Sequence, residues 1–302
     1  MTDEPSVSPL LTAALGAMCI ASSGVLVRLA ATTPVTVAFY RCLLALPVLG
    51  LIAYLERKRH GALPKRTRRL AWAAGVFFAL DLIFWHNAID AVGAGLATVL
   101  GNLQVLVVGF VAWAWLNEKP HKTLFAAVPI MLLGVVLISG VVGGDTYGRD
   151  PALGVILGIA TSVAYAAFIL VLRQGSADLR RIAGPLFHAT CVAAYSAALY
   201  GIFTGDLEWG PGWSSIGWLT ALALTSQVAG WLLISRSLPR LPAAVTSVVL
   251  LLQPVGAMAL AAVVLGEDPG SVQLMGALLI LVGVGVSTSG HQRAVTQPSP
   301  VT

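Results

Sequence analysis

The sequence predicts an all-α membrane protein of ten transmembrane helices, arranged as two inverted five-helix repeats. Three observations lead to this class: an apolar composition, long apolar runs joined by short basic links, and a chain whose two halves resemble each other. Of the 302 residues, 57% are hydrophobic and only 10% are charged, whereas soluble domains carry about 25% charged residues. The three cysteines lie in apolar runs without metal-ligand spacing, so neither a metal nor a cofactor is expected.

Ten apolar runs are long enough to cross a bilayer, which takes about 20 residues. Because backbone groups cannot stay unpaired in lipid, each run must be helical, and continuous apolarity excludes alternating barrel strands. Residues 1–9 form an N-terminal tail, and the polar segment 290–302 is expected to be disordered. The runs of the first repeat, 10–142, are 10–30, 34–55, 70–90, 93–116 and 122–142; those of the second repeat, 152–289, are 152–173, 182–204, 214–236, 242–265 and 270–289.

The basic residues collect on one side of this topology. With the N-terminus inside, fifteen of the 18 Lys and Arg residues fall in the inner links and the C-terminal tail, seven of them in the link 56–69. Only Arg149 falls in an outer link, and Arg28 and Arg41 lie within spans. This bias predicts a multi-pass protein of the cell membrane with both termini cytoplasmic. It also explains the net charge of +5 without nucleic acid, which is therefore not an expected partner.

The two halves match when the chain is shifted by 149 residues. Gln104 then falls on Gln253 and Glu118 on Glu267, and small residues around them also coincide. Since one repeat contains an odd number of helices, the second copy is inverted in the membrane. Inverted repeats are typical of secondary transporters, which alternate access around a central site.

Short motifs at equivalent positions give a more specific resemblance. LNEKP and LGEDP end the fourth helix of each half, while GVLVRLA and AFYRCLLALPVL belong to the first two helices. In these motifs the chain resembles, over about 10–289, the EamA-type members of the drug/metabolite transporter superfamily. The resemblance implies a cavity lined mainly by the first four helices of each half, and peripheral fifth and tenth helices, often at a homodimer contact. That family includes amino-acid exporters, drug efflux proteins and nucleotide-sugar carriers.

Two ionisable residues inside the spans are the first candidates for the site. Arg41 and Asp81 lie at similar predicted depth on adjacent helices, so we expect them to interact. One interpretation is a structural ion pair; the other has Arg41 or Asp81 facing the cavity and binding substrate or a proton. Proton binding by Asp81 would make an antiporter, whereas a locked pair would leave a uniporter.

Aromatic residues surround Asp81 on its helix. At 100° per residue, Phe78 and Trp85 share its face, together with Phe77 and Phe84. Aromatic rings around a carboxylate suit an organic cation or an amino-acid ammonium group. Ordinary helix packing is the alternative explanation.

Two recurring glutamines complete the predicted site. Gln104 and Gln253 lie near mid-membrane on stripes of small residues, and each amide needs a partner from another helix or a ligand. Pro254 is expected to free the carbonyl of Leu250. Either this carbonyl lines the cavity, or the proline only kinks the helix without contact to a ligand. We expect both glutamines to approach one cavity. The predicted substrate-binding residues are Arg41, Phe78, Asp81, Trp85, Gln104 and Gln253.

The motifs that are missing narrow the function class. The sequence has no metal-spaced cluster, phosphate-binding loop or nucleophile elbow, so an enzyme is not expected. Tandem inverted halves argue against a symmetric pore. The sequence predicts a secondary transporter that exports a small polar or amphipathic metabolite, such as an amino acid, across the lipid bilayer. Multidrug or organic-cation efflux is the alternative within the class, and a non-transporting membrane assembly or sensor protein is the alternative outside it.

Overall fold

The structure, a computed structural model, describes residues 8–118, 122–139, 150–266 and 268–296. Within these ranges the regular elements are helices and no strand occurs. The first repeat contains α1 (Pro9–Ala21), α2 (Ser23–Ala30), α3 (Pro34–His60), α4 (Lys65–Asn102), α5 (Gln104–Trp115) and α6 (Lys122–Ile138). The second contains α7 (Pro151–Gly175), α8 (Ala183–Thr204), α9 (Trp213–Leu222), the π-helix η2 (Ala223–Gly230), α10 (Trp231–Ser237), the 3₁₀-helix η3 (Leu238–Arg240), α11 (Ala243–Val249), α12 (Leu252–Leu265) and α13 (Ser271–Thr296).

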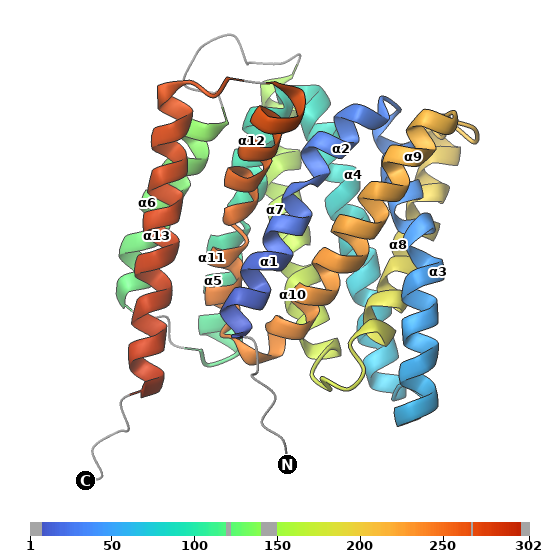
Figure 1. The fold of residues 1–302 in the computed structure, drawn as a ribbon, viewed down its shortest axis with the longest axis horizontal. Coiled ribbons are helices and arrows are strands. Elements are labelled where there is room, and N and C mark those ends of the chain that lie inside the picture. The colour runs from blue at the N-terminus through green and yellow to red at the C-terminus, as the bar shows by residue number, and fades with distance from the viewer. Residues whose placement is uncertain (1–7, 119–121, 140–149, 267, 297–302) are drawn as a thin grey trace.

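The helices confirm the predicted fold class. Eight segments of the described chain are long and apolar enough to cross a bilayer, and two shorter apolar helices, Lys122–Ile138 and Ser271–Ser287, supply the fifth and tenth spans. The outer faces carry large exposed apolar side chains such as Phe125 and Phe203, as a lipid solvent allows. In Figure 1, α1 begins, and α3 and α13 end, at one end of the bundle, while α2 ends at the other.

Helices of one repeat pack mainly against helices of the other. α4 lies against α7, α3 against α8, α1 against α10 and α12, and α6 against α13. Small residues permit this close approach: a Cβ added at Gly75 would collide with the backbone of Ala189, and one at Gly134 with the backbone of Gly276. α6 and α13 stand at the edge of the bundle (Figure 1), so the centre is built from the other spans.

The third and fourth spans meet inside one helical element, α4. A straight helix would hold Trp85 and Gly101 about 24 Å apart at 1.5 Å per residue. Instead, a Cβ built on Gly101 would lie 3.9 Å from the Trp85 ring. The chain therefore reverses direction between these residues, and α4 has an outgoing arm before the reversal and a return arm after it. Both arms reach the centre of the bundle.

Several spans are interrupted at membrane depth. The first breaks at Ser22, between α1 and α2, and the eighth contains the π-helix η2. The fourth breaks at Leu103 and the ninth between Val249 and Leu252, positions that nearly coincide under the 149-residue shift. Broken helices in a membrane are tolerated where the freed groups face protein or a cavity.

Two local expectations need correction. α13 continues to Thr296, so the first part of the segment 290–302 is helical rather than disordered. The carbonyl of Leu250 is not freed by Pro254, because the N–H of Gln253 donates to it at 3.0 Å. A tightened turn satisfies the group that the proline leaves unpaired.

Candidate functional site

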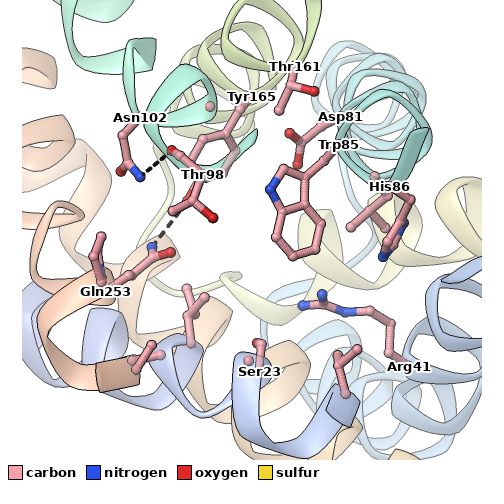
Figure 2. Close-up of a pocket in the computed structure, with 18 of the residues that line it drawn as sticks. Ser23, Arg41, Asp81, Trp85, His86, Thr98, Asn102, Thr161, Tyr165 and Gln253 are labelled. Atoms are coloured by element: carbon pink, nitrogen blue, oxygen red, sulfur yellow. Dashed lines mark hydrogen bonds between the residues drawn. The ribbon is translucent and has the colours of Figure 1, made fainter. Parts of the chain in front are cut away.

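A cavity of about 250 Å³ lies where the two repeats meet. It is lined by residues of α1, α2, α3, both arms of α4, α7, α10 and α12 (Figure 2). Its volume suits a small metabolite, since ligand pockets usually start near 300 Å³. The polar side chains on its wall are Ser23, Arg41, Asp81, Trp85, His86, Thr98, Asn102, Thr161, Tyr165, Trp231 and Gln253.

Arg41 and Asp81 both line this cavity but do not form the predicted ion pair. No nitrogen–oxygen approach within 4.0 Å joins them, and Figure 2 shows them on opposite sides of the cavity. The physical reason is that other groups hold the guanidinium: Nη2 of Arg41 donates to Oγ of Ser226 at 3.1 Å, and its carbon lies 5.7 Å from the ring centroid of Phe78. The direct ion pair is therefore absent, although the two opposite charges lie close enough to attract each other electrostatically.

Each of the two charges keeps unused bonding capacity. The Nε of Arg41 is buried and has no hydrogen-bond partner. The carboxylate of Asp81 makes no hydrogen bond or ion pair with any other described residue. Both side chains are less than a tenth exposed. Buried charges without partners are costly unless a ligand or water satisfies them, so these two groups are available to a bound solute.

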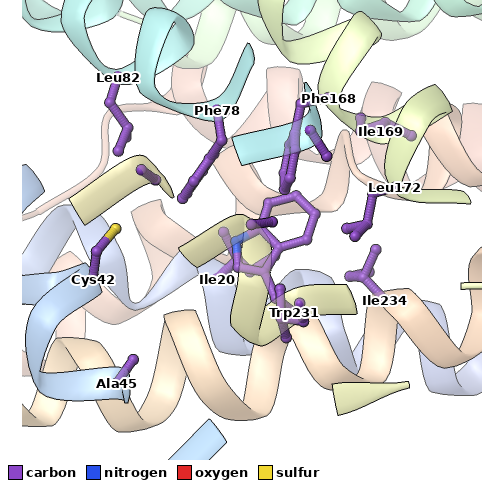
Figure 3. Close-up of a cluster of buried hydrophobic side chains, with 14 of the residues drawn as sticks. Ile20, Cys42, Ala45, Phe78, Leu82, Phe168, Ile169, Leu172, Trp231 and Ile234 are labelled. Atoms are coloured by element: carbon purple, nitrogen blue, oxygen red, sulfur yellow. The ribbon is translucent and has the colours of Figure 1, made fainter. Parts of the chain in front are cut away.

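Aromatic rings form one wall of the cavity. Phe78 stacks on Phe168 at 4.6 Å between centroids, and Phe168 meets Trp231 edge-on at 4.7 Å (Figure 3). Tyr165 lies 6.2 Å from Trp231. Of the aromatic face predicted around Asp81, Phe78 and Trp85 line the cavity, whereas Phe77 and Phe84 do not. The wall thus combines residues of both repeats.

The two glutamines occupy different environments. Gln253 lines the cavity, and its Nε2 donates to the hydroxyl of Tyr165 at 3.3 Å. Gln104 does not line it: Nε2 donates to the carbonyl of Ser247 on α11 at 3.2 Å, and Oε1 has no partner. Gly101 and Asn102, just before the break at Leu103, line the cavity, whereas Gln104, just after the break, does not.

A hydroxyl cluster that the sequence analysis missed positions Arg41. Oγ of Ser226, in η2, accepts from Oγ of Ser23 at 2.8 Å as well as from Arg41. The neighbouring Thr225 and Ser22 hydroxyls lie 3.1 Å apart. The break in the first span therefore meets the π-helix beside the guanidinium. Polar residues within apolar runs were the available signal, but only the packing shows which of them meet.

Other wall residues were also missed. Thr161 and Tyr165 are spaced by one helical turn on α7, so they share a face. Thr98 and Asn102 have the same spacing on the return arm of α4, and the amide of Asn102 donates to the Thr98 carbonyl at 2.8 Å. The sequence places each pair on one face but does not say what that face meets.

The carboxylate of Glu118 joins the two repeats at the end of the bundle where α1 begins. Glu118 contacts Nη1 of Arg173 at 2.6 Å, and its other oxygen accepts from the N–H of Ala243 at 2.8 Å. Arg173 also donates to the carbonyls of Leu238 and Leu241, at 2.9 and 3.1 Å. The residue equivalent to Glu118 in the second repeat, Glu267, lies outside the described residues. These contacts join the repeats below the cavity.

Comparisons with known proteins agree with this architecture. The profile of the EamA-like transporter family matches the chain twice, at residues 7–140 and 152–289. The chain is 21% identical over 271 residues to the uncharacterized transporter YwfM of Bacillus subtilis (strain 168), covering 87% of each protein. A solved crystal structure superposes with a TM-score of 0.78 at 17% identity, covering 93% of this chain and 98% of the other. That structural likeness bears on the fold alone.

Proposed function

Since the chain belongs to the EamA-like transporter family, we propose that it exports a small zwitterionic or amphipathic metabolite, such as an amino acid, by alternating access. The observation that carries this proposal is the separation of Arg41 and Asp81 across one cavity, each with free bonding capacity. An amino acid presents a carboxylate and an ammonium group a few bonds apart. Arg41 would take the carboxylate and Asp81 the ammonium group.

The aromatic wall supports an amphipathic substrate. Phe78, Tyr165 and Trp231 offer an apolar surface beside the two charges. An apolar or aromatic substrate side chain would bury its surface there, at about 25 cal/mol per Å² removed from water. The ring of Trp85 adds a cation–π partner for the ammonium group. These three features, which lie together, support the proposed substrate class.

The positions of the basic link and of the Glu118–Arg173 contact indicate the side of the membrane to which the cavity opens. The end tied by Glu118 and Arg173 is also the end where the basic link 56–69 lies. By the positive-inside rule this end is cytoplasmic, and α1 begins and α13 ends on the same side (Figure 1). The cavity wall includes Val27 and Val37, toward the opposite end. We therefore assign an outward-facing arrangement with the cytoplasmic side closed.

Organic-cation efflux remains the second candidate. Asp81 among aromatic rings would suffice for a cation, and such a substrate would not need Arg41. Uptake of labelled amino acids, amines and nucleosides into liposomes, with and without a pH gradient, tests both candidates. Competition by a zwitterion and not by its amide or ester supports the first. Inhibition by amines alone supports the second, and a pH-dependent flux would add proton coupling.

Orientation has its own test. In intact cells, an impermeant thiol reagent should not label Lys65→Cys, which lies in the basic link. A cysteine at Glu208, beyond α8 at the other end of the bundle, should be labelled. Labelling of the first position and protection of the second would reverse the assignment of inside and outside, and with it the direction of the open cavity.

A further inference from the structure

The link between α3 and α4 carries a dense group of unneutralised cations. We call residues 57–69 the basic platform. Its seven Lys and Arg side chains are all exposed, and among the described residues none of them pairs with a carboxylate. Like charges this close repel one another, so a counter-charge from outside the protein would stabilise them. The seven are Arg57, Lys58, Arg59, Lys65, Arg66, Arg68 and Arg69.

The nearest carboxylates are already engaged elsewhere. Glu56 accepts three backbone N–H bonds at the start of α8, from Ile182, Ala183 and Gly184, at 2.9–3.0 Å. Asp178 bonds Arg180 and Arg181, and these hydrogen bonds hold the pKa of its carboxyl group below the usual value. Neither acid neutralises the basic platform.

The basic platform is held in place against α8. Nη1 of Arg181 donates to the carbonyl of Ala62 at 2.7 Å. A Cβ added at Gly184 would lie 2.8 Å from Leu63, so that side chain packs directly on the start of α8. With the three bonds of Glu56, these contacts hold the end of α3 and the middle of the link against α8. The charges are therefore presented on a defined surface.

Aromatic side chains place this surface at the level of lipid headgroups. Tyr54 and Trp72 are about half exposed. They lie about two helical turns before the end of α3 and after the start of α4, respectively. Nζ of Lys58 lies 5.1 Å from the ring centroid of Tyr54, and the guanidinium of Arg68 lies 5.3 Å from that of Trp72. Exposed Tyr and Trp mark the membrane interface. The cations above them then lie among the phosphates.

We propose that the basic platform is a binding site for anionic phospholipid headgroups of the cytoplasmic leaflet. Clusters of four to eight basic residues next to a transmembrane helix attract anionic lipids, with about a fivefold gain in affinity per Lys or Arg. Phosphates accept hydrogen bonds from guanidinium groups in bidentate geometry. This assignment does not depend on which solute the cavity carries.

Native mass spectrometry of the purified full chain tests it with two lipids of equal acyl chains. We expect phosphatidylglycerol to bind more tightly than phosphatidylcholine, and the difference to shrink as salt rises from 0.05 to 0.5 M (roughly threefold shorter Debye length). Arg68→Gln with Arg69→Gln should weaken phosphatidylglycerol binding by about 30-fold. The matched control is Arg236→Gln with Arg240→Gln, which removes two exposed charges at the same end but outside the basic platform.

Equal affinity for the two lipids would overturn the proposal, as would equal losses in the platform and control variants. If the platform variant does not fold, Arg57→Gln with Arg59→Gln gives a second measurement on the same surface. The salt titration on the unmodified chain needs no variant. Phosphatidylglycerol binding that is indifferent to salt would contradict an electrostatic headgroup site. Solute flux is not the readout, so these results are separable from the transport proposal.

Discussion

Arg173 of the second repeat and Glu118 of the first meet at 2.6 Å and close the bundle on the side where the chain starts. Glu118 reaches Arg173 with one oxygen and the first N–H of α11 with the other. It therefore serves as a helix cap and an ion-pair partner at once. If the proposed alternating access opens this end of the bundle, both bonds must break.

Weakening that contact should favour the inward-open state. Glu118→Gln removes the charge and keeps a cap, so we expect about 1 kcal/mol less stabilisation of the closed side, roughly a fivefold change in the ratio of states. The pair is partly exposed, which limits the effect. Thiol labelling from outside of Ala257→Cys, a cavity residue, in a chain without native cysteines, should slow accordingly. Asp178→Asn, which breaks an ion pair at the same end, should leave the rate unchanged.

Neutralising either charge of the cavity should impair binding without unfolding the protein. Breaking a buried ion pair costs about 3–5 kcal/mol, but Arg41 and Asp81 are not paired. Asp81→Asn and Arg41→Gln should therefore have the same expression level and thermal midpoint as the unmodified chain. Arg41→Gln should abolish transport of carboxylate-bearing solutes, whereas Asp81→Asn should abolish transport of ammonium-bearing ones. If both single variants were poorly expressed and the double variant recovered normal expression, the result would support a structural ion pair between Arg41 and Asp81 instead.

Removing the hydroxyl that holds Arg41 should alter affinity more than turnover. Ser226→Ala deletes the acceptor of the guanidinium bond, and hydrogen bonds to charged groups contribute about 1.5–3 kcal/mol. Without this bond the guanidinium of Arg41 is free to reorient, so it binds the solute less well but remains in the cavity. We therefore expect KM for the transported solute to rise about tenfold, with kcat little changed. Thr225→Ala is the matched control, since Thr225 meets Ser22 and not Arg41. An equal effect in both variants would indicate damage to the π-helix instead.

The two glutamines should respond differently to substitution. Gln253→Ala removes the bond to Tyr165 at the cavity wall, so transport should fall while the thermal midpoint changes little. Gln104→Leu replaces an amide whose Oε1 is already unpartnered and buried. An apolar side chain of similar size there should be neutral or stabilising and should leave KM as it was. A rise in KM for Gln104→Leu would show that this residue reaches the solute.

Close helix contacts give a prediction about stability. A Cβ at Gly75 would collide with the Ala189 backbone, whereas one at Gly109 would meet nothing within 4 Å. Gly75→Ala should therefore lower the thermal midpoint by separating α4 from α8. Gly109→Ala should be neutral or raise it, because alanine favours helix over glycine by about 1 kcal/mol. Similar midpoints for the two variants would contradict the close packing of α4 on α8.

The sequence by itself determined the architecture, because lipid imposes one strong constraint on the backbone. Apolar runs in a solvent without hydrogen-bond partners must be helices. In the described chain, eight of the ten predicted runs are helices long enough to cross a bilayer, and the other two are shorter apolar helices. The 149-residue shift likewise predicted a two-fold repeat, and the two family matches, one to each half, confirm the repeat. Arg41, Phe78, Asp81, Trp85 and Gln253 were singled out because polar and aromatic groups inside a span demand an explanation.

Only the tertiary structure decided which of these groups meet. Equal depth placed Arg41 beside Asp81, but depth leaves the rotation of each helix open, and Ser226 holds the guanidinium elsewhere. Repeat symmetry placed Gln104 beside Gln253, but Gln104 bonds the carbonyl of Ser247 on α11, and only Gln253 lines the cavity. Periodicity defines a face on each helix, whereas the partner of that face depends on packing between helices distant in sequence. Tyr165, Trp231 and Ser226 belong to the site for that reason alone.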